Sequence, residues 1–328
     1  MLPESRALLR VYWPVRRRKN VPMETHRTQP RHDGHASALT TDTSSKKAMP
    51  RVDFLSPAGA AALYAPDSLT WQVHKNPVSM FIGGIAAVLL ELAEPRVRSR
   101  IWGHSSFSTD VTTRIRRTGL AALTTIYAPA DTAAQLIRGI VRMHESVRGV
   151  TPAGVHYRAN DPVLLDWVQT TVCFAFMEAY ASFVRPLTDA ERDRFYAESR
   201  ASARLFGAVG APQSLAAQKA QFEAMNAILE YHPIVHDFLS IMQRTYVLPR
   251  PLHGLQNMML RAAVSILPDW VAARLELGTA LRLRPWEKTF LKRLAALADR
   301  IPLSFAPPAQ ACRRLGLPSS YLYRRRVP

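Results

Sequence analysis

Proline and polar capping residues divide this chain of 328 residues at intervals that predict helices. Asp161 precedes Pro162, which is typical of an N-cap followed by proline in the first helical position, and Pro186 ends the helix that follows. Thr188 and Glu191 have the spacing of a capping box. Because no stretch alternates apolar and polar residues long enough to predict a strand, we expect an all-α fold. Further helices are predicted over residues 214–230, 233–244, 252–267, 269–277, 285–300 and 309–315.

Composition favours one helical domain over residues 52–328, because a hydrophobic content of 48% supplies a sizeable core. Residues 1–51 are basic and lack a sustained apolar period, so we expect a disordered tail. Cys173 and Cys312 have no paired spacing, which favours a reducing compartment. No secretory signal is evident, and the longest uncharged run, between Lys75 and Glu91, is too short to span a bilayer. We therefore predict a cytoplasmic protein.

More than half of the net charge of +18 lies at the two ends of the chain, and the remaining +8 is spread over residues 52–323. Residues 1–51 hold eleven Lys and Arg against four Asp and Glu, and residues 324–326 add three arginines. Nucleic-acid binding needs a localised basic stripe with interleaved aromatic residues, and the rest of the chain has none. We expect no nucleic-acid partner, whereas the basic tails can make a peripheral contact with an anionic membrane surface or remain solvated.

Residues 114–148 carry the strongest indication of chemistry. They form two predicted helices with a break at residues 128–130. Arg114, Arg117 and Thr118 share one face of the first helix. In the second, His144 lies on an apolar stripe, with Arg148 one turn further on the same side. A core-facing histidine opposite two cations and a hydroxyl suits a haem iron ligand below a polar distal group. The same pattern also fits a hydrogen-bonded core histidine and a solvated arginine face.

These motifs, R-x-x-R-T followed by H-x-x-x-R-G, resemble the family of latex-clearing proteins (rubber oxygenases) and MpaB-type oxygenases. Residues 76–95, 103–105 and 149–168 extend the resemblance, which covers roughly residues 52–325. It implies a haem b cofactor with His144 as proximal iron ligand and Arg148 as its supporting arginine. Arg117 stands where rubber-cleaving members have a lysine, and Gln169 stands where many relatives have a histidine.

The resemblance further implies a globin-like haem-binding helical domain with added helices. The expected activity is an oxygenase reaction, with molecular oxygen and an unsaturated hydrophobic substrate such as an isoprenoid, a lipid chain or a polymer. Arg117 and Thr118 would face oxygen or the reacting end of the substrate, while Arg114 and Arg148 would orient the site or neutralise haem propionates. The alternatives are a non-catalytic haem protein that binds or senses a diatomic ligand, and a helical scaffold without cofactor.

Other histidines are weaker candidates. His232 and His236 have a spacing that can bind a metal, but Pro233 between them is expected to open a helix and leave His232 off that face. His104 and His156 lie in segments where either a cofactor contact or a turn-forming role fits.

Overall fold

The computed structural model describes residues 52–103 and 111–323. The predicted tail at residues 1–51, the three arginines at residues 324–326 and His104 lie outside the described residues.

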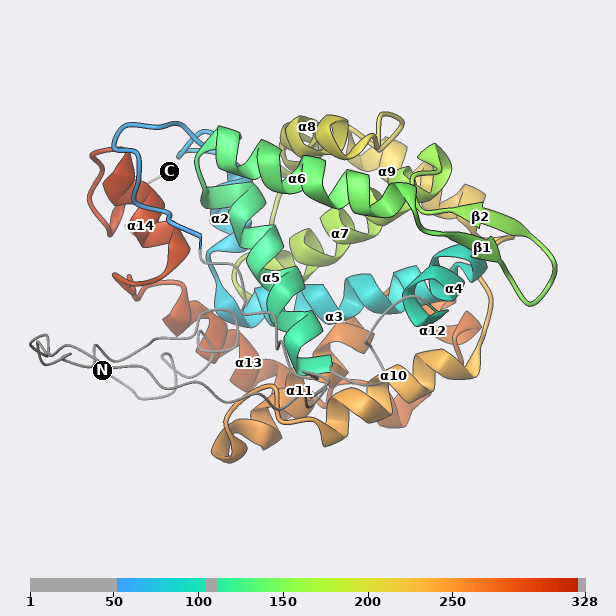
Figure 1. The fold of residues 1–328 in the computed structure, drawn as a ribbon. Helices are drawn as coiled ribbons and strands as arrows, with labels where there is room; N and C mark the ends of the chain where they lie inside the picture. Colours follow the sequence, from blue (N-terminus) through green and yellow to red (C-terminus); the bar gives the residue numbers. More distant parts are fainter. Residues whose placement is uncertain (1–51, 104–110, 324–328) are drawn as a thin grey trace, which may run out of the picture.

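The described residues form thirteen α-helices, which confirms the all-α expectation (Figure 1). The helices are α2 (Leu69–His74), α3 (Pro77–Ala93), α4 (Pro95–Gly103), α5 (Val111–Tyr127), α6 (Ala130–Glu145), α7 (Pro162–Phe183), α8 (Asp189–Phe206), α9 (Leu215–Met225), α10 (Pro233–Arg244), α11 (His253–Ser265), α12 (Asp269–Arg274), α13 (Pro285–Ala298) and α14 (Pro307–Arg314). Short 3₁₀ helices occupy residues 250–252, 279–281 and 321–323. The globin-like arrangement stays a prediction.

One small antiparallel hairpin, β1 (Arg148–Val150) and β2 (His156–Arg158), joins α6 to α7. The sequence held no alternating stretch long enough to predict a strand, so this hairpin was not anticipated. Each strand has only three residues, which is too short for an alternating pattern to be recognised in the sequence.

The predicted capping residues begin their helices as expected. The Asp161 side chain accepts hydrogen bonds from the backbone N–H groups of Val163 and Leu164 at the start of α7. Thr188 and Glu191 form the capping box of α8, in which each side chain bonds the backbone N–H of the other residue, at 3.2 Å and 2.9 Å. These caps satisfy backbone donors that a helix start leaves unpaired.

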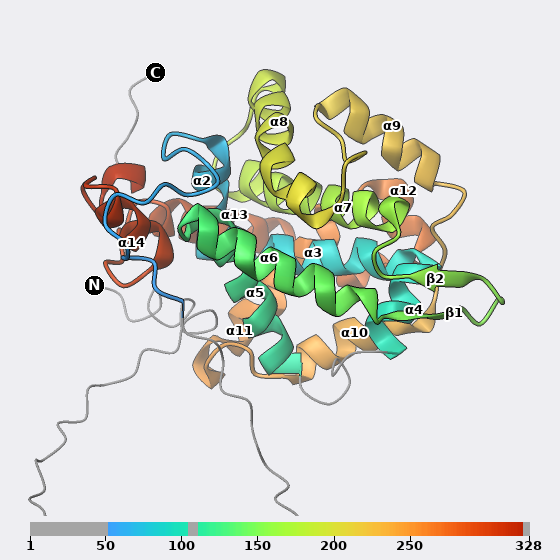
Figure 2. The same ribbon diagram turned by 45° about the horizontal axis from the view of Figure 1, so that its top comes forward.

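Helix α3 runs through the middle of the described fold. It packs against α7, α11 and α13, and α5 crosses in front of it in the view of Figure 1; Figure 2 shows the same helices after a 45° turn. Fourteen of its seventeen residues are buried. The buried hydrophobic cluster to which they belong extends along the chain from Phe54 to Leu322. This continuous core fits one domain across the described residues.

Two buried cations hold the first and last described segments together. Lys75 Nζ lies 2.9 Å from Asp299 Oδ2 and donates to the Leu322 carbonyl at 2.8 Å. Arg314 donates to the carbonyl oxygens of Phe54 at 2.9 Å and Tyr127 at 2.8 Å. A buried cation is costly unless it is paired or hydrogen-bonded, so these contacts hold residues near the start of the described chain against residues near its end.

Within the described residues, no individual helix combines the length and the apolar character required to cross a membrane. Helices α3 and α4 satisfy that requirement only when taken together, and they are bent by 111° relative to each other.

The close approach of α3 and α7 gives a stability prediction. A Cβ atom at Gly83 would lie 2.9 Å from Phe176 Cα, whereas one at Gly84 would have no atom within 4 Å. We expect Gly83→Ala to lower the free energy of unfolding by about 1–3 kcal/mol through overpacking. Gly84→Ala, the matched control, should raise it by about 0.5–1 kcal/mol because alanine favours the helix. Urea unfolding measures both, and equal stabilities of the two variants would contradict the packing.

Candidate functional site

The two helices predicted around residues 114–148 are present as α5 and α6, and they pack against each other. The break falls at Ala128 and Pro129, where Pro129 stands in the N-cap position of α6. The backbone N–H of Ala130 donates to the Ala61 carbonyl at 2.8 Å, which anchors this end of α6.

Ionisable side chains from five different elements meet beneath these helices. We call them the polar cluster: Glu91 on α3, Arg100 on α4, Arg114 on α5, His144 on α6 and Tyr157 on β2. Each of them acts electrostatically on at least one other member, so the fold brings together residues spread over 67 positions of sequence.

Glu91 is the acid of the polar cluster. Burial raises its pKa to about 7, although the positive charges of Arg100 and Arg114 act in the opposite direction. Burial lowers the pKa of both arginines, and the negative charge of Glu91 raises it. Arg100 also donates from Nη1 to the Ala159 carbonyl at 3.2 Å, which links α4 to the residue after β2. Two guanidinium groups therefore interact with one carboxyl group in the polar cluster.

His144 is held in its neutral form. Burial, and to a smaller extent the nearby positive charge of Arg100, lowers its pKa to about 4. Its Nδ1 atom is buried and has no hydrogen-bond partner among residues 52–103 and 111–323. A neutral imidazole is the form that binds a metal ion, and a buried ring nitrogen without a partner requires an explanation.

This set of groups fits an iron cofactor that carries carboxylates. A neutral imidazole is a suitable ligand for iron, and the guanidinium groups of Arg100 and Arg114 are of the kind that binds anionic substituents. A haem matches both features, because its iron binds an imidazole and its two propionates are anionic. No group of three or more His, Cys, Asp or Glu side chains in the described part of the chain could hold a bare metal ion.

The remaining predicted site residues lie in different surroundings. Arg117 and Thr118 are exposed on α5, although Arg114, on the same face, is half-buried in the polar cluster. The roles assigned to Arg117 and Thr118 stay predictions. Gln169, half-buried on α7, donates from Nε2 to Cys173 Sγ at 3.2 Å.

Arg148 does not continue the helical face that carries His144. Helix α6 ends at Glu145, and Arg148 is exposed on β1. The placement of Arg148 on the helix was wrong because the chain turns into the hairpin, where Gly149 pairs with Tyr157. A Cβ atom at Gly149 would lie only 2.6 Å from Tyr157 Oη, so glycine permits this close contact. The support of a cofactor by Arg148 stays a prediction.

Glu91 and Arg100 were missed as site residues. Glu91 is the first charged residue after Lys75 in an otherwise uncharged stretch, and that isolation was an available signal. Arg100 is one of three closely spaced arginines on α4, and the sequence does not distinguish them. In the structure Arg96 pairs with Glu94 and Arg98 pairs with Glu230, which leaves Arg100 facing the polar cluster.

The other histidines have local structural roles. His232 is the N-cap of α10 and accepts from the Ile234 N–H at 3.2 Å, as the intervening proline indicated. His236 Nε2 lies 3.2 Å from the Leu275 carbonyl. His156 is exposed on β2, whereas its neighbour Tyr157 is buried.

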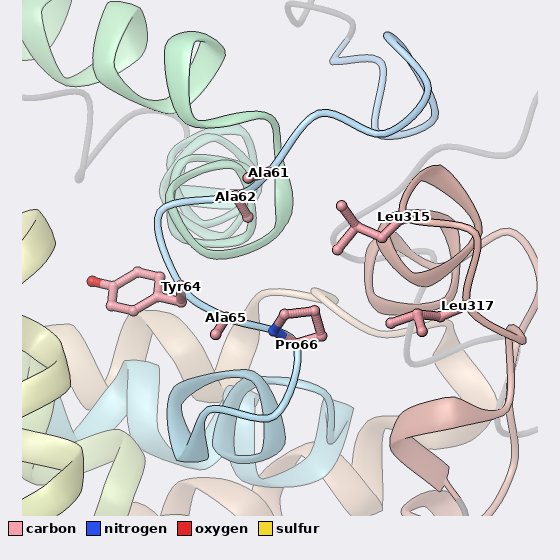
Figure 3. A pocket seen from close by; sticks show the side chains of 7 residues that line it. All are labelled: Ala61, Ala62, Tyr64, Ala65, Pro66, Leu315 and Leu317. Carbon is pink, nitrogen blue, oxygen red and sulfur yellow. The ribbon is translucent and has the colours of Figure 1, made fainter.

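An apolar groove of about 460 Å³ lies between residues 61–66 and the leucines Leu315 and Leu317 (Figure 3). The Ala61 carbonyl of this groove bonds the first residue of α6. His144 lies fourteen residues further along that helix, roughly 21 Å away at the rise of an α-helix. The groove is therefore separate from the polar cluster.

Comparison with known families identifies the class of protein. The family described as "ER-bound oxygenase mpaB/B'/Rubber oxygenase, catalytic domain" matches residues 71–300. This span covers more than half of the chain and includes every member of the polar cluster. The chain belongs to this family of oxygenase catalytic domains, which confirms the resemblance of the motifs. No curated protein and no solved structure matches the chain.

The low pKa of His144 gives a pH prediction. Its pKa is about 4 in the folded chain and 6.5 without burial, so the unfolded chain binds one more proton between these values. The contribution of His144 to the free energy of unfolding should be fully present above about pH 6.5. It should fall as the pH drops towards about 4, by at most about 1.4 kcal/mol per pH unit for each such histidine. The buried His74, whose pKa is also about 4, contributes in the same way.

Urea unfolding between pH 4 and 6.5 tests this expectation. His144→Gln should reduce the pH slope of the unfolding free energy by the contribution of one histidine, and His74→Gln should do the same. A slope in His144→Gln equal to that of the wild type would show that His144 is not held neutral.

Proposed function

We propose that this chain is a haem-b-dependent oxygenase that acts on an unsaturated hydrophobic substrate, such as an isoprenoid or lipid chain. The observation that carries the proposal is the neutral His144, whose buried Nδ1 lacks a partner among the described residues, beside two arginines in an oxygenase-family domain.

The residues of the polar cluster would bind different parts of the cofactor. His144 would bind the iron through its imidazole, and Arg100 and Arg114 would hold the propionates by charge-assisted hydrogen bonds. Glu91 would position both guanidinium groups, since its charge acts on each of them. Haem supplies the activation of molecular oxygen when bound, and the protein supplies ligation, orientation and an apolar surrounding.

Arg117 and Thr118 would act on the substrate side. Both are exposed on α5, one turn from Arg114. The Arg117 guanidinium would donate hydrogen bonds to the reacting oxygen or to the polar end of the substrate, and the Thr118 hydroxyl would assist it. Fixed donors directed at developing negative charge can change a rate by roughly a hundredfold.

The iron ligand is tested by absorption spectroscopy. Protein purified after expression with a haem supply should show a Soret band, and His144→Ala should abolish or strongly shift it because the ligand is lost. His236→Ala is the control and should keep the wild-type band, since His236 bonds the Leu275 carbonyl. Equal spectra for the wild type and His144→Ala would contradict the assignment. Oxygen uptake with formation of an oxidised alkene product would distinguish an oxygenase from a haem protein that only binds a diatomic ligand.

The two groups of arginines should differ in their effects. We expect Arg117→Ala to keep haem occupancy and to lower turnover of an alkene substrate by roughly a hundredfold. Thr118→Ala should act in the same direction but less, because it removes a neutral hydroxyl. Arg100→Ala and Arg114→Ala should instead lower haem occupancy. Arg96→Ala, on α4 and paired with Glu94, is the matched control. Wild-type turnover in Arg117→Ala would refute its role in the reaction.

A further inference from the structure

The β1–β2 hairpin extends beyond the helices in both views of the fold (Figures 1 and 2). Its register pairs Arg148 with Arg158, Gly149 with Tyr157 and Val150 with His156. Side chains alternate between the two faces of a hairpin, and paired residues share a face. Tyr157 is buried towards the polar cluster, so the outer face carries the four exposed side chains. They are Arg148, Val150, His156 and Arg158.

Two like charges oppose each other on this outer face. Arg148 and Arg158 are directly paired, an arrangement that destabilises a hairpin unless an anion lies nearby. Neither arginine takes part in an ion pair within residues 52–103 and 111–323. Between residues 138 and 158 the chain has four arginines and one acid, the exposed Glu145. This end of the molecule is therefore suited to an anionic partner.

The tip of the hairpin is uncharged and apolar. Residues 151–155 read Thr-Pro-Ala-Gly-Val. Hydrogen bonds hold this turn in place, from the Thr151 N–H to the Val155 carbonyl at 2.8 Å and from the Val155 N–H to Thr151 Oγ1 at 3.1 Å. Val155 and Val150 are 50% and 51% exposed. Apolar side chains thus stand at the tip, and the two paired arginines stand behind them.

We propose that this hairpin docks on an anionic lipid bilayer, with its apolar tip in the boundary between headgroups and acyl chains. Arg148 lies two residues behind Val150, about 7 Å along a strand. That distance matches the roughly 5–8 Å depth of the headgroup layer of one leaflet, so the arginines reach the lipid phosphates when the valines reach the acyl boundary. A nucleic acid would satisfy the arginines but would leave the exposed valines unburied. The proposal does not depend on the proposed function.

Vesicle flotation with the full chain tests the charge and the apolar tip separately. The vesicles are phosphatidylcholine alone, or phosphatidylcholine with about 30% phosphatidylserine. Arg158→Ala should weaken binding to the anionic vesicles by about fivefold, as expected for one basic residue at a membrane surface. Val155→Asp should also weaken it. Arg244→Ala and Val209→Asp change an exposed arginine and an exposed valine elsewhere, and they should bind like the wild type.

A fluorescent label at the tip separates hairpin docking from binding by other basic segments. Cys173 and Cys312 are buried, so Val155→Cys provides a selectively reactive thiol for an environment-sensitive dye. Its emission should shift to the blue on anionic vesicles, whereas the same dye on Val209→Cys should not shift. Binding without a shift at residue 155 would overturn the proposal. Tight binding of single-stranded DNA to the protein would also overturn the proposal if Arg158→Ala weakened that binding and Val155→Asp left it unchanged. The arginines would then serve a nucleic acid, and the apolar tip would have no part in binding.

Discussion

The burial of Glu91 beside Arg100 and Arg114 is the constraint on which the candidate site depends. A carboxylate inside a helical core loses its hydration, and this loss raises the pKa of Glu91 to about 7 despite two nearby cations. Each guanidinium is likewise desolvated and depends on the negative charge of Glu91. The three groups come from α3, α4 and α5, so the electrostatic interactions of Glu91 with both arginines connect these three helices.

The backbone at the end of α3 brings these charges together. Glu94 ends α3, and its side chain accepts from the Val97 N–H at 2.7 Å in the first turn of α4. The two helices are bent by 111°, and Arg100 on α4 lies near Glu91 on α3 after this bend. The apolar length of α3, packed against α7 at Gly83, holds this corner rigidly. Helix α3 thus contributes its apolar length to the core of the domain, and the bend between α3 and α4 places Glu91 and Arg100 in the polar cluster.

Sequence patterns predicted the elements whose signals are local. Asp161 and Thr188 began their helices as expected, and the break near Pro129 separated α5 from α6. The other members of the polar cluster were not predictable in the same way, because Glu91 and Arg100 join the cluster only through the packing of α3 and α4. Arg148 was misplaced because a three-residue strand has no recognisable period and the end of α6 lacks a strong stop signal. Local chemistry was therefore predictable, whereas the assembly of charges was not.

We propose that His144 holds the iron of a haem within the polar cluster, and chemical rescue of a cavity variant tests this assignment most directly. His144→Gly removes the imidazole and leaves space for a free one. We expect this variant, loaded with haem, to lack the wild-type Soret spectrum and to regain it when imidazole is added. A wild-type spectrum in His144→Gly before imidazole is added would contradict the account, because another group would then bind the iron.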